Sequence, residues 1–480
     1  MIESKFKYEI VVTDNTTNYN APIDVFDLTD INDPSFVLTE TKEKGKMYYT
    51  KKIKNKLTIG GTFFTYFRTN KIYCRKYWVN IYKKCSPNSW TFIYRAYFSD
   101  KNIEYDLDKC SAEIELQDKS PYNCFNEKRA QKVDIYGAAQ TANLGLSVSP
   151  TLFRSMDWWQ AVLTVCSDLT CCDEFGCYYP LVSTFFNWQK DGFGGSTFPD
   201  DQAMLNPVNP AEPNYYIRLC AKSDVKNPTA SNPAGKLMMS FDDIEKIMSE
   251  VFNVFWVIED YYLRWEHYSY FTQSVNYDAT IATNFPLNKL KNKVKYNIEE
   301  LPETETFDMM EANGADFIGL PIVYDSNCAN GKDRERGYGF VTTETDYIIY
   351  NSSSIANEGF VLVDCYKVNA TPEWFVYTDT GAISGLNIKN VRLSWANLHN
   401  DLHKYGRPFI NGTMNGVFTI FNSKVPDVIQ ENIIVNNCCT DDYEKWESSV
   451  RTEIGDGIID EAEIDFTKEQ IKFKLRHGNF

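Results

Sequence analysis

The chain has 480 residues, a formal net charge of −16 and 15% aromatic residues. This length is enough for roughly two to four domains, and the negative charge argues against general binding to nucleic acid, whose phosphates it repels. No apolar run is long enough for a membrane span, and the N-terminus lacks the basic-then-apolar pattern of a secretory signal. The 13 cysteines, an odd number in a chain with no such signal, favour reduced thiols over a disulfide framework.

The charge is unevenly distributed along the chain. Residues 1–137 contain 22 Lys and Arg against 18 Asp and Glu, a net charge of +4, so the remainder carries −20. Opposite charges in the two parts are complementary to each other. One hypothesis is that the basic end of one subunit contacts the acidic body of the next, and the alternative is that both are ordinary solvated surfaces.

The N-terminal part has the pattern of an antiparallel β domain. Four stretches place apolar residues at every second position: residues 72–82, 90–98, 103–107 and 112–116. In residues 90–98 the alternating set is Trp90, Phe92, Tyr94, Ala96 and Phe98. We expect an antiparallel sheet here, buried on one side and solvated on the other.

Residues 51–98 also mix basic and aromatic side chains, as platforms for single-stranded nucleic acid or glycans do. The alternative is an ordinary strand surface whose aromatic rings face the core. The overall acidity makes nucleic acid the weaker interpretation.

The strand pattern fades after Gly137, and residues 156–169 predict a short helix. A thiol cluster begins within this helix: Cys166, Cys171, Cys172 and Cys177. Zinc is one interpretation, but the paired two-residue spacers of zinc knuckles are missing. A disulfide is a second interpretation. The favoured interpretation is that these cysteines are buried or merely local thiols. Asp173 and Glu174 have the wrong sign to activate a redox thiol.

Residues 191–236 are rich in Gly, Pro and Asn and predict long loops at a domain boundary. After them, Ser240 and Asp243 have the spacing of a helix N-cap and an acid at the third helical position. An apolar stripe with helical spacing follows: Ile244, Ile247, Met248, Val251 and Phe252. Residues 254–258 and 261–268 then predict two strands joined by a tight turn.

The next part has a weaker pattern. Residues 290–305 are charged and predict a connection, and three strands are expected at 317–324, 347–350 and 359–363. A helix is expected from Asn390 to the stop at Gly406 and Pro408.

That helix contains the sharpest metal candidate, because His399 and His403 are four residues apart with Asp401 between them. A hydrolytic zinc helix has Glu directly after its first His, where this chain has Asn400, and no third ligand is identifiable. Two partly exposed histidines are the favoured interpretation.

The C-terminal residues predict a β-hairpin. Ala462, Ile464 and Phe466 alternate with acids, and Ile471, Phe473 and Leu475 alternate with basic residues, so opposite charges pair across the strands. Residues 456–463 superficially resemble a calcium loop. Aligned on Gly457, however, Thr452 and Ile454 occupy two positions where acidic ligands are needed.

These patterns together predict an α+β fold that is predominantly antiparallel β, with a β-sandwich or barrel-like N-terminal domain and a few amphipathic helices. The expected parts are an antiparallel β domain (1–137), a loop-rich cysteine-containing insertion (138–239), a helix with an aromatic hairpin (240–310), a mixed α/β domain ending in a helix (311–410) and a hairpin region (411–480).

Three stretches resemble structural tail proteins of tailed phages that infect Bacteroidetes, including crAss-like phages. They are residues 241–271, residues 317–363 with the segment Thr342–Ile349, and the 395–408 helix with Arg451–Gly457 and the terminal hairpin. Together they cover roughly the last half of the chain. The resemblance implies a baseplate or tail-hub-like virion protein that assembles as a ring in the host cytoplasm and contacts neighbouring tail or neck proteins. It transfers no functional residues.

The leading hypothesis is therefore a non-enzymatic tail protein, with no catalytic, cofactor-binding or metal residue assigned and no cofactor. A second hypothesis is a glycan- or receptor-binding tail protein that uses the 191–236 loops. A third is a metal-dependent hydrolase that uses His399, Asp401 and His403 or the thiol cluster. No Gly-x-Ser-x-Gly, Walker or dinucleotide motif supports an enzyme, but the distance between carboxylates needed to judge glycoside cleavage is invisible in sequence.

Overall fold

The computed structural model describes part of the chain. The described residues are 6–13, 22–28, 36–43, 46–54, 56–70, 76–86, 89–118, 121–137, 142–146, 149–169, 171, 179–183, 214–221, 236–251, 254–259, 262–267, 270–271, 275–278, 287–288, 293–297, 303–309, 322–325, 332–338, 360–367, 374–376, 418–421, 428–436, 449–452 and 455–477.

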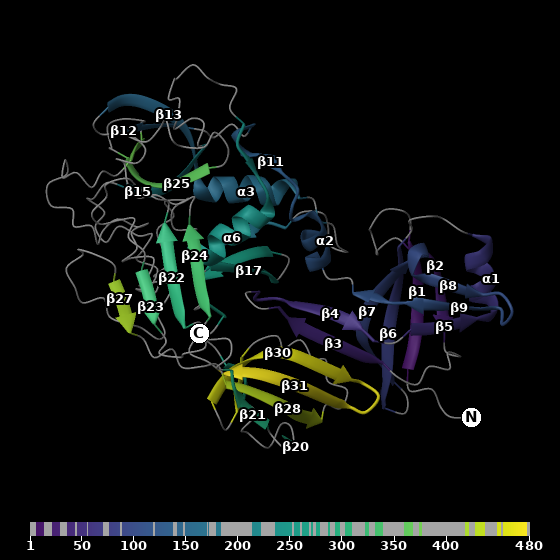
Figure 1. Cartoon of the computed structure of the whole chain (residues 1–480). Helices are drawn as coiled ribbons and strands as arrows, with labels where there is room; N and C mark the ends of the chain where they lie inside the picture. The colour runs from purple at the N-terminus through teal and green to yellow at the C-terminus, as the bar shows by residue number, and fades with distance from the viewer. Residues whose placement is uncertain are drawn as a thin grey trace.

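The described residues form mostly antiparallel sheets with a few short helices (Figure 1), so the predicted β-rich α+β fold class is confirmed. The N-terminal part contains a five-stranded sheet in the order β10-β7-β6-β1-β2. Its strands are β1 (Phe6–Thr13), β2 (Pro22–Leu28), β6 (Lys76–Ser86), β7 (Ser89–Ser99) and β10 (Gln117–Asp118). A second sheet has the order β5-β9-β8. Its strands are β5 (Lys56–Gly60), β8 (Ile103–Asp106) and β9 (Ser111–Glu115).

The alternating strands expected between residues 72 and 116 are thus divided between two sheets. The 3₁₀ turn Asp100–Asn102 separates β7 from β8 and directs the chain into the second sheet. Both sheets and helix α1 (Gly61–Thr69) contribute side chains to one hydrophobic core. Phe67 of α1, for example, packs edge-on against Tyr77 of β6, with ring centroids 4.6 Å apart.

The C-terminal hairpin is confirmed as β30 (Gly455–Asp465) and β31 (Gln470–His477), with Glu461 opposite Lys474 and Glu463 opposite Lys472. It does not stand alone, because β3 (Val37–Lys42) pairs with β30 and with β4 (Tyr49–Ile53). The same sheet includes β19 (Val275–Asp278), β20 (Leu287–Asn288), β21 (Lys293–Tyr296), β28 (Val428–Asn436) and β29 (Ser449–Thr452). Side chains of β30 and β31 enter the N-terminal core, so the two ends of the chain share it.

A second core surrounds the predicted helix and aromatic hairpin, which are confirmed as α6 (Phe241–Val251), β17 (Val254–Glu259) and β18 (Tyr262–His267). The Ser240 hydroxyl accepts a hydrogen bond from the Asp243 amide, and the Asp243 carboxylate accepts one from the Ser240 amide. This is the predicted N-cap with a reciprocal acid. The expected helix near residue 160 is confirmed as α3 (Trp158–Asp168), whereas α2 (Pro121–Lys128) was not predicted.

Five strands close into a barrel after residue 137. They are β12 (Ala142–Leu146), β13 (Ser149–Asp157), β15 (Asn214–Ala221), β25 (Phe360–Lys367) and β26 (Trp374–Val376). The predicted loss of strands after Gly137 and the all-loop interpretation of 191–236 are thus wrong. Long-range pairing, such as β15 with β25, supplies a stability that local propensity does not show.

Four further strands form a separate sheet: β22 (Thr304–Met309), β23 (Ile322–Asp325), β24 (Asp333–Tyr338) and β27 (Phe418–Phe421). Strand β21 lies within residues 290–305 and β22 begins there, so the expectation that this stretch is a connection without strands is wrong. The predicted strands near 322 and 360 are confirmed by β23 and β25. Residues 347–350 and the expected helix 390–408 lie outside the described residues. The five-part domain division stays a prediction. Among the described helices, none is long and apolar enough to cross a membrane.

Candidate interaction surface

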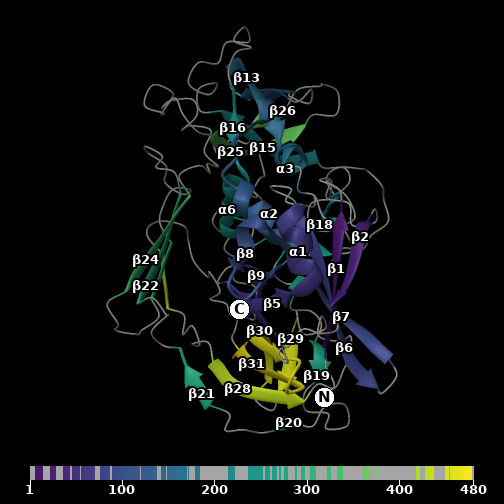
Figure 2. The same cartoon turned by 90° about the vertical axis from the view of Figure 1, so that its right-hand side faces the viewer.

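The β6–β7 hairpin presents an aromatic and basic surface on the side of its sheet that faces away from the core. Figure 2 shows the hairpin extending beyond the neighbouring strands. Residues 76–99 contain four basic residues and no acidic one. Trp90 and Phe92 are 38% and 43% exposed, respectively. We call Trp90, Phe92, Tyr82, Lys84 and Arg95 the hairpin surface.

A β-bulge creates this exposure. Ile81 pairs with Tyr94 but Tyr82 pairs with Phe92, so Ile93 is an extra residue in β7. Side chains alternate between faces along a strand, so an inserted residue exchanges the faces beyond it. The rings before the bulge, Trp90 and Phe92, therefore lie on the outer face, whereas Tyr94, Ala96 and Phe98 are buried.

The sequence expectation that residues 90–98 keep one alternating face is therefore wrong. The alternative that the aromatic rings of residues 51–98 face the core is confirmed for part of the stretch, whereas a platform for nucleic acid or glycans stays a prediction. Rings such as Tyr77 and Phe98 face the core, and their centroids are 5.1 Å apart. Trp90 and Phe92 face outward.

A ladder of polar contacts holds the outer face in place. The Arg95 guanidinium lies 5.7 Å from the Phe92 ring centroid and donates through Nε to Asn80 Oδ1 at 2.8 Å. Asn80 in turn donates to Glu9 Oε1 at 2.8 Å. The Tyr82 ring packs edge-on against Phe92 at 5.7 Å. Because Arg95 and Tyr82 hold the Phe92 ring in place, this ring loses little conformational entropy when a partner binds.

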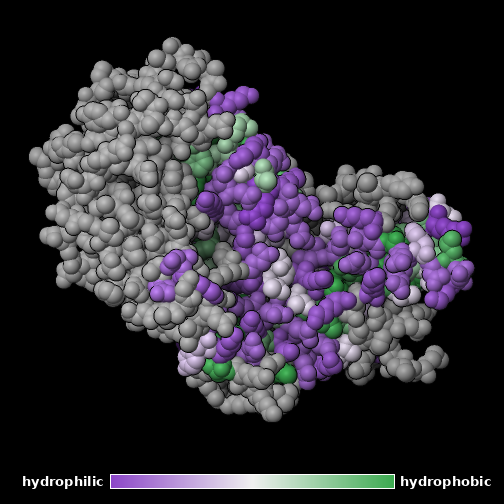
Figure 3. All heavy atoms as spheres, in the orientation of Figure 1, coloured by the Kyte–Doolittle hydropathy of each residue, from purple (hydrophilic) through white to green (hydrophobic). Residues whose placement is uncertain are grey.

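The opposite side of the hairpin is anchored to the C-terminal sheet. Lys83 is only 2% exposed, and its ammonium lies 3.0 Å from the Glu469 carboxylate in the β30–β31 turn. This contact supports the hairpin from the inside and leaves its outer rings uncovered. On the face shown in Figure 3, which has the orientation of Figure 1, the described surface is largely hydrophilic and hydrophobic side chains gather only in small patches.

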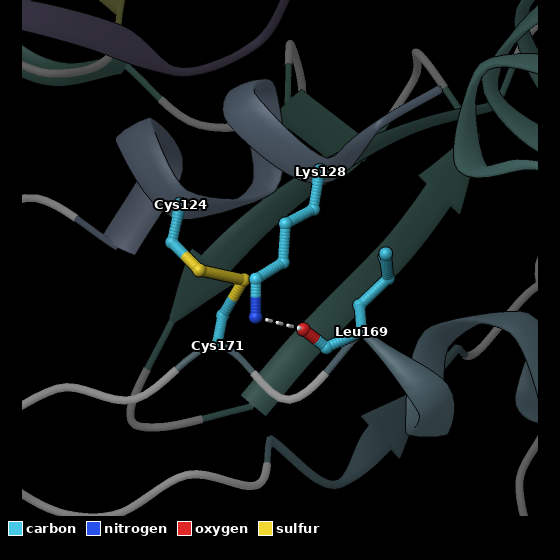
Figure 4. The surroundings of a disulfide bond; sticks show 4 residues. All are labelled: Cys124, Lys128, Leu169 and Cys171. Atoms are coloured by element: carbon cyan, nitrogen blue, oxygen red, sulfur yellow. Dashed lines mark hydrogen bonds between the residues drawn. A yellow bond between two sulfur atoms is a disulfide. The ribbon is translucent and has the colours of Figure 1, made fainter. Parts of the chain in front are cut away.

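The thiol cluster has a different outcome from the one expected. Cys171 forms a disulfide with Cys124 of α2, with their Cα atoms 5.7 Å apart (Figure 4). The preference for reduced thiols is therefore wrong at Cys171. The sequence could not show this pairing, because Cys124 precedes it by 47 residues and lies on a helix that was not predicted. Cys166 is a free thiol whose pKa is raised by burial. Cys172 and Cys177 lie outside the described residues.

The proposed metal helix with His399, Asp401 and His403 also lies outside the described residues. Within them, no three His, Cys, Asp or Glu side chains form a group that could hold a metal ion. At the calcium-like segment, Gly457 and the residues that follow belong to β30, as the hairpin interpretation predicts. The Asp456 carboxylate there forms an ion pair with Arg451 at 2.7 Å.

No protein-family model matches the chain, and no curated protein matches it. Several solved structures are similar to it. The prophage tail protein gp18 from Listeria monocytogenes EGD-e has a TM-score of 0.39 and 10% identity, over 98% of this chain and 95% of that one. The 43 kDa tail protein of prophage MuSo2 from Shewanella oneidensis has a TM-score of 0.38 and 8% identity, over 98% of each chain.

A third similar structure is the Francisella PdpA–VgrG complex, with a TM-score of 0.35 and 9% identity. That match covers 99% of this chain and 58% of the other.

Proposed function

We propose that this chain is a non-enzymatic structural protein of a bacteriophage tail, of the baseplate or tail-hub type, which assembles with copies of itself into a ring. It would act in the virion tail, after assembly in the host cytoplasm, beside other tail or neck proteins. The observation that carries the proposal is the hairpin surface, where two exposed aromatic rings sit among basic residues on a rigid support. The sequence resemblance of the last half of the chain to phage tail proteins supports the same function.

The composition of the hairpin surface is that of a protein–protein contact. Trp, Tyr and Arg are the residues most enriched among those that dominate binding energy. Fixed aromatic side chains also provide a large contact area at a small entropic cost. The exposed rings of Trp90 and Phe92 and the guanidinium of Arg95 combine these features within one short strand segment.

Charge favours a second copy of the chain as the partner. The hairpin is purely basic, and the residues after 137 carry a net charge of −20. A basic projection on one copy is thus attracted to the acidic body of another, and repeating the contact around an axis closes a ring.

The test is the assembly state of the full chain measured by sedimentation velocity over a range of concentrations. Trp90→Ala and Phe92→Ala should each weaken assembly about 30-fold, because a truncation at an interface centre typically costs about 2 kcal/mol. Added salt should weaken it further. Tyr262→Ala is the matched control, since Tyr262 is 42% exposed in β18. A wild-type chain that stays monomeric at high concentration and is absent from purified virions would contradict the proposal.

A further inference from the structure

A polar pocket of about 450 Å³ lies where the N-terminal sheets meet α2. Its walls come from β4, β7, β10 and α2. Its volume falls within the range of about 300–1,000 Å³ that is typical of small-molecule sites. It is separate from the hairpin surface, because none of the five residues that define that surface lines it.

The charges around the pocket cancel. Three lysines and three carboxylates line it, so its formal net charge is zero. A ligand with several charges of one sign would meet repulsion on one wall for every attraction on another. The lining therefore favours a ligand with no net charge.

The remaining lining groups both donate and accept hydrogen bonds. The side chain of Gln117 lines the pocket and makes no hydrogen bond with another described residue; its amide can both donate and accept. Asn126 accepts a hydrogen bond from the Tyr48 hydroxyl at 3.0 Å, while its amide nitrogen has no partner among the described residues. The half-buried Tyr97 ring adds an apolar flat surface.

The phenol of Tyr97 is kept neutral. Burial, together with the nearby carboxylates of Glu127 and Asp118, raises its pKa above the ordinary value. It therefore keeps its proton at physiological pH, and the ring adds no charge to the pocket.

The wall formed by α2 is fixed before any ligand arrives. Cys124 of this helix is disulfide-bonded to Cys171, and the Lys128 ammonium donates to the Leu169 carbonyl at 3.0 Å (Figure 4). On the pocket side, Asn123 Nδ2 donates to the Asp118 carbonyl at 3.1 Å. A pocket whose walls do not need to be ordered on binding has a smaller entropic cost.

From the zero net charge, the mixed donors and acceptors and the aromatic wall, we propose that this pocket binds a neutral saccharide of one or two rings. Sugar hydroxyls donate and accept at once, which matches the amide groups of Gln117 and Asn126. The flat apolar face of a pyranose ring matches the Tyr97 ring. This is a binding activity beyond the structural role proposed above, and it does not depend on that role.

The experiment is saturation-transfer NMR followed by titration calorimetry on the purified full chain. The probes are glucose, galactose, mannose, N-acetylglucosamine and lactose at millimolar concentrations, with glucose 6-phosphate as the charged comparison. At least one neutral sugar should bind saturably and more tightly than glucose 6-phosphate. Gln117→Ala and Tyr97→Ala should each weaken binding about tenfold, the equivalent of one lost hydrogen bond or ring contact.

Gln131→Ala is the matched control, since Gln131 is exposed just after α2 and does not line the pocket; it should leave binding unchanged. Circular dichroism on every variant separates loss of binding from loss of fold. If Tyr97→Ala does not fold, the Gln117→Ala variant still tests whether the pocket binds the sugar. The proposal is overturned if no neutral sugar binds, if glucose 6-phosphate binds as tightly, or if a folded Gln117→Ala chain binds like wild type.

Discussion

The Cys124–Cys171 disulfide should hold α2 against the end of α3, and removing it should loosen α2 selectively. Cross-linking residues 47 apart removes chain entropy from the opened state worth about 4 kcal/mol in the loop-closure treatment. Each 1.4 kcal/mol is a factor of about ten, so amide exchange in α2 should accelerate by up to about a thousandfold after reduction. The remaining links, such as the Lys128–Leu169 hydrogen bond, oppose complete release.

The assay is amide hydrogen exchange followed by mass spectrometry, comparing wild type with the double variant Cys124→Ser and Cys171→Ser. Helix α1 serves as an internal reference, because it packs in the other core. Cys110→Ser removes an exposed free thiol and should change nothing. Equal exchange rates in α2 for the oxidised wild type and the double variant would refute this account of the disulfide.

Three further predictions concern buried contacts. A Cβ on Gly457 would lie 2.8 Å from the His477 ring, so Gly457→Ala should lower the unfolding free energy by about 1–3 kcal/mol in urea titrations. Burial lowers the pKa of His477, so the unfolded state binds the proton more tightly than the folded state does. The stability contributed by neutral His477 should be fully present above about pH 6.5 and should fall as the pH drops through the folded-state pKa. The variant His477→Gln should remove that pH dependence. Glu245 accepts hydrogen bonds from Arg129 and from Trp256 Nε1, so Glu245→Ala should lower the unfolding free energy by about 3–5 kcal/mol. A loss near zero would show that these contacts do not stabilise the fold.

Elements with strict local periodicity were predictable from the sequence. In β31, Ile471, Phe473 and Leu475 are buried between basic residues, so the pattern alone defines a strand and its inner face. In α6 the cap and the stripe agree, and the helix forms where both predict it. Local and tertiary preferences coincide in these elements, which is why sequence reasoning succeeds there.

Other elements depend on partners far away in the chain. β12 contains Asn143 and Gly145, which have low strand propensity, yet β13 and β26 pair with it on both sides. β3 meets β30 across more than four hundred residues, and no local pattern in either strand indicates the other. The helix signal of α2 is short, consisting of Ser120 followed by Pro121 at the first helical position.

The candidate surface was only half predictable, for a specific reason. The aromatic and basic composition of residues 51–98 singled out the stretch that contains the exposed rings of Trp90 and Phe92. The exposed side chains, however, are selected by the bulge at Ile93, which is a property of the pairing between β6 and β7. A single inserted residue reverses every side chain beyond it, so a composition signal cannot tell a contact surface from a core until the register is known.

The position of β3 and β4 explains how a contact at the hairpin surface can act on the whole molecule. Tyr48 packs in the core around α6, whereas its neighbour Tyr49 packs in the core shared by the two chain ends and donates to the Ile459 carbonyl at 2.8 Å. The Lys83–Glu469 ion pair then connects the hairpin to the same C-terminal sheet. The hairpin is therefore connected through paired strands and close-packed rings to both cores. This connection supports the proposed use of the hairpin surface as a contact between copies.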